Sequence, residues 1–225
     1  MDLSFQQLAK HIEHTRVKGQ DDLKEITGAC EKALVYNFGA VCVNPFFVQK
    51  ASGILKGSGV EVCTGIGYPL GAGLLEIKAQ EMREVIKLGA DAVDFVISVA
   101  AVKSGMMDVI EREMKTLVSQ SEGAITKAII ETCYLTPDEI FRVSRIAAEH
   151  GVQYIKTSTG MGPRGASLED IGIIKKAVAG RCRIKASGGI RSVEEALAFL
   201  NAGAERLGTS NGDSIVDSFK ERYGV

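Results

Sequence analysis

The sequence predicts a (β/α)₈ barrel, an α/β fold, from three observations. A short apolar run recurs eight times along the 225 residues. Seven of these runs follow a helical stretch and a glycine, and the glycine spacing runs from 20 (59 − 39) to 34 (123 − 89) residues, about one strand plus one helix. Strands that alternate with helices pair in parallel, and eight such units suggest closure. We expect a single barrel domain over residues 1–225, since such domains typically have about 250 residues; an open doubly wound sheet is the alternative.

The expected strands are short and apolar. Glycine accepts the left-handed conformation that ends a helix, which explains its place before each later run. These glycines are Gly39, Gly59, Gly89, Gly123, Gly151, Gly180 and Gly203. The expected strands are His11–Thr15, Val41–Asn44, Val60–Ile66, Ala92–Ser98, Ile125–Thr132, Val152–Ser158, Arg183–Ser187 and Arg206–Thr209.

Several helix starts are also marked. Residues 136–139 (Thr-Pro-Asp-Glu) place a capping side chain, a proline at the first helical position and a carboxylate three residues after the cap. Residues 192–195 form a second capping box, and residues 167–170 a weaker third. Between Leu75 and Ile86, apolar residues at helical spacing predict one buried helix face.

Composition excludes several classes of function. The formal net charge is −1, from 27 Lys and Arg against 28 Asp and Glu, and no basic patch points to nucleic acid. No apolar run approaches the ~18 residues that a membrane span needs, and the first ten residues lack a signal pattern. The five scattered cysteines contain no C-x-x-C and indicate buried thiols in a reducing compartment. We therefore expect a cytoplasmic protein.

We single out one charged residue in each of three expected strands. Because strand side chains alternate, Asp94, Lys156 and Lys185 point into the barrel while their apolar neighbours face the helices. Active sites of such barrels lie at the carboxyl ends of the strands. Lys156 and Lys185 lie on consecutive strands, which are expected to be neighbours about 4.8 Å apart.

Two lysines placed in this way predict a reactive amine. A free lysine, with a pKa of about 10.4, is almost entirely protonated at pH 7, and burial and a like charge both disfavour the ammonium. A neutral amine attacks a carbonyl to form a Schiff base. Asp94 would keep the second lysine charged and pass protons. The structural alternative is a buried Lys–Asp ion pair without a catalytic role.

Glycine-rich segments follow the same strands, at residues 160–165, 187–191 and 208–212. Barrels often bind phosphate after their last two strands, through bare backbone N–H groups and helix N-termini. Turn glycines are the structural alternative; together with the lysines, they predict a phosphorylated substrate. The three histidines have no metal-ligand spacing with cysteines or carboxylates, and residues 65–71 do not match a dinucleotide fingerprint. Neither a metal nor an organic cofactor is expected.

The sequence resembles the deoxyribose-phosphate aldolase family along nearly its whole length. The most specific match is the pair Lys-Thr-Ser-Thr-Gly at 156–160 and Lys-Ala-Ser-Gly-Gly at 185–189, 29 residues apart (185 − 156). Further matching segments are residues 41–45, 67–71 and 131–135. The resemblance implies a metal-independent lyase on a (β/α)₈ barrel. It implies reversible cleavage of 2-deoxy-D-ribose 5-phosphate to D-glyceraldehyde 3-phosphate and acetaldehyde.

The resemblance also implies roles for individual residues. Lys156 would be the Schiff-base nucleophile, Lys185 the ammonium that tunes it, and Asp94 the proton donor or acceptor. Cys42 matches a cysteine near the substrate. The residues that match positions around the family's phosphate site are Gly160, Gly188, Gly189, Arg191, Gly208 and Ser210. The implied partners are sugar phosphates and aldehydes, with no membrane or nucleic acid, in a monomer or homodimer.

The chain departs from the family pattern near the expected cavity. Glu13 replaces the usual aspartate, Arg16 a neutral residue, Ser98 the usual asparagine, and Met161 an aromatic residue or lysine. These changes leave open a related Schiff-base aldolase for another phosphorylated aldehyde or ketose. A catalytically silent sugar-phosphate-binding barrel is the third hypothesis.

Overall fold

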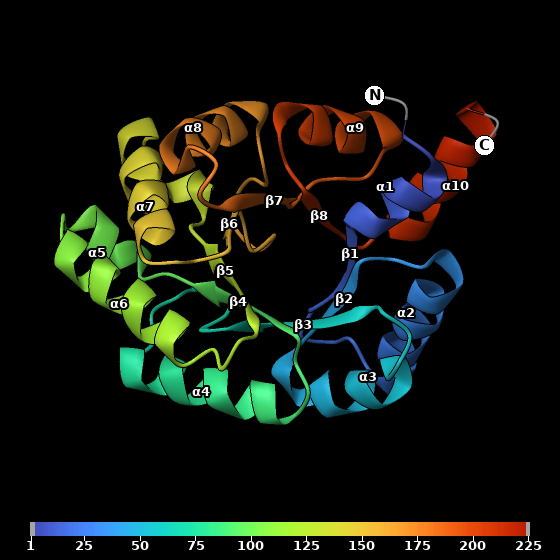
Figure 1. The fold of residues 1–225 in the computed structure, drawn as a ribbon, viewed down its shortest axis with the longest axis horizontal. Coiled ribbons are helices and arrows are strands. Elements are labelled where there is room, and N and C mark those ends of the chain that lie inside the picture. Colours follow the sequence, from blue (N-terminus) through green and yellow to red (C-terminus); the bar gives the residue numbers. More distant parts are fainter. Residues whose placement is uncertain (1–2, 224–225) are drawn as a thin grey trace.

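A computed structural model, which describes residues 3–223, forms a closed barrel of eight parallel strands surrounded by helices (Figure 1). Each strand pairs with its neighbours in the sequence, and the first pairs with the last, so the barrel prediction is confirmed and the open sheet is excluded. The strands are β1 Ile12–Arg16, β2 Ala40–Val43, β3 Glu61–Ile66, β4 Ala92–Val96, β5 Ile125–Ile129, β6 Tyr154–Lys156, β7 Arg183–Ser187 and β8 Arg206–Thr209.

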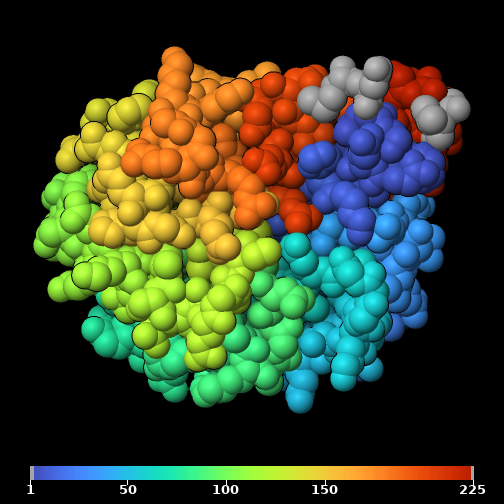
Figure 2. All heavy atoms as spheres, in the orientation of Figure 1, coloured from blue at the N-terminus to red at the C-terminus, as the bar shows by residue number. Residues whose placement is uncertain are grey.

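The helices cover the outside of this barrel. In the chain's first half they are α1 Phe5–His11, α2 Leu23–Tyr36, η1 Pro45–Phe47, α3 Val48–Leu55, α4 Leu75–Lys87, α5 Val99–Lys103 and α6 Met107–Ser119. In the second half they are η2 Thr132–Tyr134, α7 Pro137–Glu149, α8 Leu168–Val178, α9 Val193–Ala202 and α10 Gly212–Tyr223. The first and last helices lie side by side, with α1 in blue against α10 in red (Figure 2).

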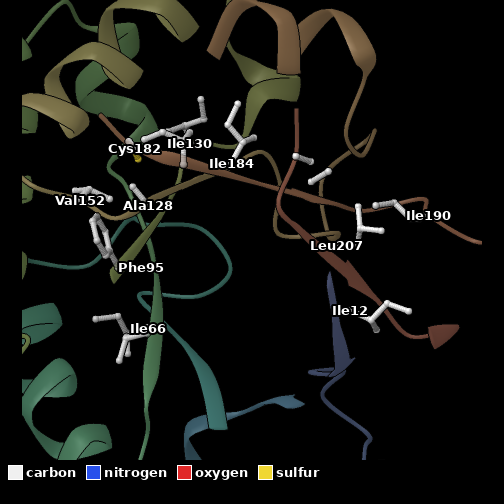
Figure 3. Close-up of a cluster of buried hydrophobic side chains, with 14 of the residues drawn as sticks. Ile12, Ile66, Phe95, Ala128, Ile130, Val152, Cys182, Ile184, Ile190 and Leu207 are labelled. Atoms are coloured by element: carbon white, nitrogen blue, oxygen red, sulfur yellow. The ribbon is translucent and has the colours of Figure 1, made fainter. Parts of the chain in front are cut away.

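The main apolar core lies between the strands and the helices. Strand residues such as Phe95, Ile184 and Leu207 point outward and are fully or almost fully buried there (Figure 3). Inside the barrel, the apolar cluster consists of small side chains: Ala40, Cys42, Cys63 and Ala92. Small residues leave interior space for long side chains, and here the long ones are charged.

Two of the helix starts have the complete predicted capping box. The side chains of Thr136 and Ser192 accept from the backbone N–H groups of Glu139 and Glu195. In each box the glutamate side chain accepts in turn from the backbone N–H of the cap residue. Ser167 caps α8 through Asp170 N, without the reciprocal bond. Two further capping boxes, at Ser4 and Asp22, were not predicted.

The first strand was predicted at His11–Thr15, and the structure places it one residue later, at Ile12–Arg16. Its start is wrong because His11 belongs to α1, whose capping box at Ser4 was not recognised. Strand β2 lies one residue earlier than expected and β3 begins one residue later. Three other strands end two or three residues before their expected last residue, because the chain leaves the sheet as it enters the loops at the carboxyl ends. These are β4, β5 and β6, which end at Val96, Ile129 and Lys156.

Gly39 does not end a helix as expected. Helix α2 ends instead at Asn37, which adopts the left-handed conformation (φ 55°). A Cβ on Gly39 would lie 1.8 Å from Arg206 Nη1 and 2.3 Å from the carbonyl oxygen of Lys10. Glycine is needed here for a close approach at the foot of the barrel. The other six glycines do have positive φ.

Candidate active site

Strand alternation brings the three predicted charged residues together inside the barrel. Lys156 on β6 and Lys185 on β7 are register partners. Lys156 Nζ lies 2.8 Å and Lys185 Nζ 2.7 Å from the same oxygen of Asp94, Oδ2. Asp94 and Lys185 are fully buried, and Lys156 is 5% exposed.

Two further charged residues complete this group, and neither was predicted as part of it. Lys127 on β5 is the register partner of Asp94, and its Nζ lies 3.2 Å from Asp94 Oδ1 and 3.4 Å from Glu13 Oε1. Glu13 on β1 also pairs with Lys185 through Oε2. Lys127 stands in the apolar run Ile125–Ile129, so the alternation that identified Asp94 would have identified it too. We call Glu13, Asp94, Lys127, Lys156 and Lys185 the charged cluster.

Ion pairing keeps most of the charged cluster ionised despite its burial. Burial alone would raise the pKa of Asp94, but the ammoniums of Lys127, Lys156 and Lys185 outweigh it and hold that pKa well below its usual range. The pKa of Glu13 is lowered by Lys127 and Lys185 against the effect of burial.

The pKa values of Lys127 and Lys185 are raised, although burial alone would lower them. Burial favours the neutral amine, but Asp94 and Glu13 outweigh it and raise the pKa of Lys185 well above its usual range. The pKa of Lys127 is likewise raised against burial, by Asp94, Cys63 and Glu13. Desolvation therefore does not neutralise Lys185.

A cavity of about 250 Å³ opens at the carboxyl ends of the strands. Lys156 lines it, whereas the other four members of the charged cluster do not. The glycine-rich segments after β6, β7 and β8 supply the opposite wall. All six residues expected near a phosphate line this cavity: Gly160, Gly188, Gly189, Arg191, Gly208 and Ser210.

Close backbone packing explains two of the glycines in this wall. Gly188 has a φ of 86°, and a Cβ on it would lie 2.8 Å from the Cα of Gly165. A Cβ on Gly165 would in turn lie 2.0 Å from the carbonyl oxygen of Gly188. The β6–α8 and β7–α9 loops therefore contact each other through bare backbone.

Cys42 lies beside the charged cluster and does not line the cavity. Its thiol, that of Cys63 and a carboxylate oxygen of Asp94 all lie within 4.8 Å of one another, a grouping that could hold a metal ion. The site suits a cation poorly, because Asp94 already accepts from Lys156 and Lys185 and Lys127 Nζ lies 3.4 Å from Cys63 Sγ. Burial raises the pKa of Cys63 well above its usual range, while the hydrogen bond with Cys63 lowers the pKa of Cys42.

The residues that depart from the family pattern fall into different places. Glu13 belongs to the charged cluster, and Arg16 and Met161 line the cavity. Ser98 lies outside both: its side chain caps α5 and its N–H donates to Glu113. His14 faces outward and stacks on Phe38, and burial lowers its pKa to about 4, so it is a neutral structural side chain.

These features define a class of protein: a (β/α)₈ barrel enzyme with its active site at the carboxyl ends of the strands and a lysine at the cavity floor. The model of the DeoC/LacD family of aldolases matches residues 5–216. The chain belongs to this family.

Relatives agree over almost the full length of the chain. A protein of Geobacillus sp. named deoxyribose-phosphate aldolase is 45% identical over 211 residues, which cover 93% of this chain and 95% of the relative. A protein of the same name from Dictyoglomus turgidum is 41% identical, with 94% and 96% covered.

Solved structures give the same result. A structure described as QR15, an aldolase, superposes with a TM-score of 0.92 at 40% identity, covering 96% of this chain and 97% of the other. A putative deoxyribose-phosphate aldolase from Coccidioides immitis gives 0.93 at 32% identity, covering 96% and 87%.

No helix among residues 3–223 has the length and apolar character required to cross a membrane.

Proposed function

We propose that this protein is a deoxyribose-phosphate aldolase, which reversibly cleaves 2-deoxy-D-ribose 5-phosphate to D-glyceraldehyde 3-phosphate and acetaldehyde. One observation carries the proposal: Lys156 Nζ lies between a buried carboxylate and a cavity walled by glycine-rich loops. The amine can meet an aldehyde there, while backbone N–H groups receive a phosphate. The names of the relatives support this substrate.

The charged cluster contains more lysines than carboxylates. With every member ionised, three ammoniums face two carboxylates, which leaves one net positive charge (3 − 2) in a buried site. Lys185 and Lys127 each lie between Asp94 and Glu13, whereas Lys156 pairs with Asp94 alone. Loss of a proton from Lys156 removes the surplus charge and creates the nucleophile.

The reaction follows from this arrangement. Neutral Lys156 attacks the aldehyde of the open-chain sugar phosphate and gives a carbinolamine, then a protonated imine. The imine accepts the electrons of the C2–C3 bond as a base removes the C3-hydroxyl proton, and C3 leaves as the aldehyde carbon of D-glyceraldehyde 3-phosphate. The enamine that remains is protonated and water hydrolyses the resulting acetaldehyde imine. Asp94, Lys185 and water share the proton transfers.

The lysine supplies the electron sink, so the proposed reaction uses neither a metal nor an organic cofactor. The proposed partners are sugar phosphates and aldehydes, without nucleic acid or membrane. A single catalytic domain over residues 1–225 and a monomeric or homodimeric state remain predictions. The five cysteines, none of them in a disulfide, support a reducing compartment such as the cytoplasm.

Trapping of the imine tests the proposal. Borohydride reduction in the presence of acetaldehyde should add a two-carbon unit to Lys156, as peptide mass spectrometry would show. Lys156→Ala should lose both the adduct and turnover, whereas Lys176→Ala, at an exposed lysine of α8, should retain both. A wild-type protein without the adduct would be a silent sugar-phosphate-binding barrel, and near-normal turnover by Lys156→Ala would refute the assignment of the nucleophile.

A second candidate function is a related aldolase for another phosphorylated aldehyde or ketose. Arg16 and Met161 favour it because both line the cavity and both depart from the family pattern. Cleavage assays across a panel of sugar phosphates separate the two candidates: deoxyribose phosphate should give the highest kcat/KM if the first is correct.

A further inference from the structure

Glu131 is a buried carboxylate for which the proposed reaction has no use. It lies two residues after the end of β5, is 3% exposed and adopts a left-handed backbone conformation (φ 49°, ψ 64°). That conformation is unfavourable for a residue with a Cβ and persists only where surrounding contacts impose it. The contacts that impose it here are made by the carboxylate.

The carboxylate of Glu131 binds Thr159, three residues after the proposed nucleophile. Thr159 N lies 3.3 Å from Oε1 and 3.2 Å from Oε2, and Thr159 Oγ1 donates to Oε2. The third polar group of Thr159, its carbonyl oxygen, accepts from the hydroxyl of Tyr68 at 2.7 Å. All three polar groups of Thr159 are thus held from the ends of β3 and β5.

Thr159 begins a thin wall between two cavities. Residues 159 and 161 line both the 250 Å³ cavity and a separate cavity of about 100 Å³, which is mostly apolar and is also lined by Glu131. Met161 N donates to Thr159 Oγ1 at 3.0 Å, which ties the wall to the same threonine. Gly160, expected at the phosphate, lies in the middle of this wall. The position of its backbone therefore depends on Thr159.

Lys156 is anchored by different contacts. Its strand is held by backbone on both sides: Ile130 N donates to the carbonyl of Lys156 at 3.0 Å, and Thr157 N donates to the carbonyl of Lys185 at 3.1 Å. Neither bond uses the carboxylate of Glu131. Lys156 Nζ itself is held by Asp94. Removal of the Glu131 contacts would release the wall and leave the nucleophile in place.

We infer that Glu131 is a positioning residue for the phosphate side of the substrate. Its carboxylate fixes Thr159 and, through it, the backbone at Gly160 that faces the phosphorylated end of the sugar. This inference rests on the proposed function, since it concerns how that same site distinguishes phosphorylated from unphosphorylated carbonyl compounds.

A carboxylate suits this position better than an amide does. The N–H of Thr159 donates to both carboxylate oxygens and its hydroxyl donates to Oε2, so both oxygens must accept. Glutamine keeps the shape of the side chain but offers one accepting oxygen and one donating NH₂ group. In Glu131→Gln one contact would become donor against donor, and the charge assistance would be lost.

The test compares two substrates in Glu131→Gln. We expect KM for 2-deoxyribose 5-phosphate to rise about tenfold, with kcat changed less than about twofold and the inhibition constant of inorganic phosphate raised in parallel. The rate of acetaldehyde adduct formation on Lys156 should match that of the wild-type protein. Glu122→Gln is the matched control, because Glu122 is also a left-handed glutamate (φ 49°) but is exposed. It should change neither KM for 2-deoxyribose 5-phosphate nor the inhibition constant of inorganic phosphate.

Two further variants separate the carboxylate from the backbone and from general stability. Glu131→Gly tolerates the left-handed conformation but lacks the carboxylate, so it should keep the raised KM. Thr159→Val should raise KM for the phosphorylated substrate as well, and Thr159→Ser should restore it. These threonine variants provide the test if the Glu131 variants do not fold.

Several results would overturn the inference. They are a wild-type KM in Glu131→Gly, an equal loss of acetaldehyde trapping and of phosphate affinity in Glu131→Gln, or equal behaviour of Glu131→Gln and Glu122→Gln. The proposed function fails separately, if wild-type Lys156 forms no acetaldehyde adduct. Calorimetric titration with inorganic phosphate would still compare the variants in that case.

Discussion

One oxygen of Asp94 accepts from two ammoniums at once, Lys156 Nζ at 2.8 Å and Lys185 Nζ at 2.7 Å. The other oxygen lies 3.2 Å from Lys127 Nζ. At the scale of single residues, the chemistry of the site therefore depends on how many positive charges surround this carboxylate. Removal of one charge changes the protonation of those that remain.

Lys185→Leu should shift the pH dependence of imine formation upward and slow turnover at neutral pH. With Lys185 absent, Lys127 and Lys156 balance Glu13 and Asp94, so the cluster loses a positive charge that disfavours further ammoniums beside it. The rate of acetaldehyde trapping on Lys156, measured from pH 6 to about pH 10, would show the shift. Lys176→Leu, on the surface of α8, controls for the loss of a lysine. An unchanged profile would mean that Lys185 does not tune the nucleophile.

Asp94→Asn should destabilise the protein by about 3–5 kcal/mol at pH 7, because it leaves buried ammoniums without their carboxylate. The pKa of Asp94 is depressed in the folded state, so its stabilising contribution is fully present above the unfolded pKa near 3.9 and is lost as the pH falls through the folded pKa. Urea unfolding at pH 7 and at acid pH measures this. The difference from wild type should shrink only below about pH 4; a difference that is constant at every pH would exclude the electrostatic explanation.

The sequence predicted this group of residues only in part. Alternation identified Asp94, Lys156 and Lys185 and would equally have identified Lys127, since each of the four has apolar residues on both sides or on the opposite face of its strand. Glu131 also lies in the expected strand Ile125–Thr132 on the same face as Lys127, but the strand ends at Ile129, so alternation does not describe its surroundings. Its left-handed backbone and buried carboxylate depend on Thr159, which follows a different strand.

At the scale of elements, the cavity wall depends on loops that contact each other through backbone alone. Gly188 and Gly189 lie in the same turn with nearly equal φ, 86° and 84°. A Cβ on Gly188 would meet Gly165 at 2.8 Å, whereas a Cβ on Gly189 would have no neighbour within 4 Å among the described residues. The two positions therefore separate conformational strain from collision.

Gly189→Ala should cost about 1 kcal/mol of unfolding free energy, since alanine is strained at positive φ. Gly188→Ala should cost more by a further 1 kcal/mol or so, because the β7–α9 loop must also move away from Gly165. It should raise KM for the phosphorylated substrate as well. Urea unfolding and steady-state kinetics of both variants measure these effects; equal losses would show that the contact between the loops is unimportant.

The positions of the elements could be read from the sequence, but their exact bounds could not. Cap residues are local signals, and Thr136 and Ser192 begin helices as predicted. Strand ends depend on neighbours, and β6 ends at Lys156 where the pairing stops, two residues before the expected end. Gly39 shows the same dependence on distant residues. Glycine is required there because a side chain would collide with Arg206, which is 167 residues away in the sequence (206 − 39).

At the scale of the whole molecule, eight repeated units predicted eight strands, and the structure has the expected order. Closure itself is not a local property. Ile12 pairs with Leu207, and no pattern near either residue specifies the other. The prediction of a closed barrel rested instead on the number of strand–helix units and on a pattern that runs without interruption.

The pairing of β1 with β8 has a consequence for the order of assembly. Glu13 on β1 contacts Lys185 on β7, the neighbour of β8, so this contact forms only when the two ends of the chain come together. Until then an incomplete chain holds lysines on later strands without one of their two counterions. The polypeptide would thus acquire its full electrostatic balance only when the barrel closes.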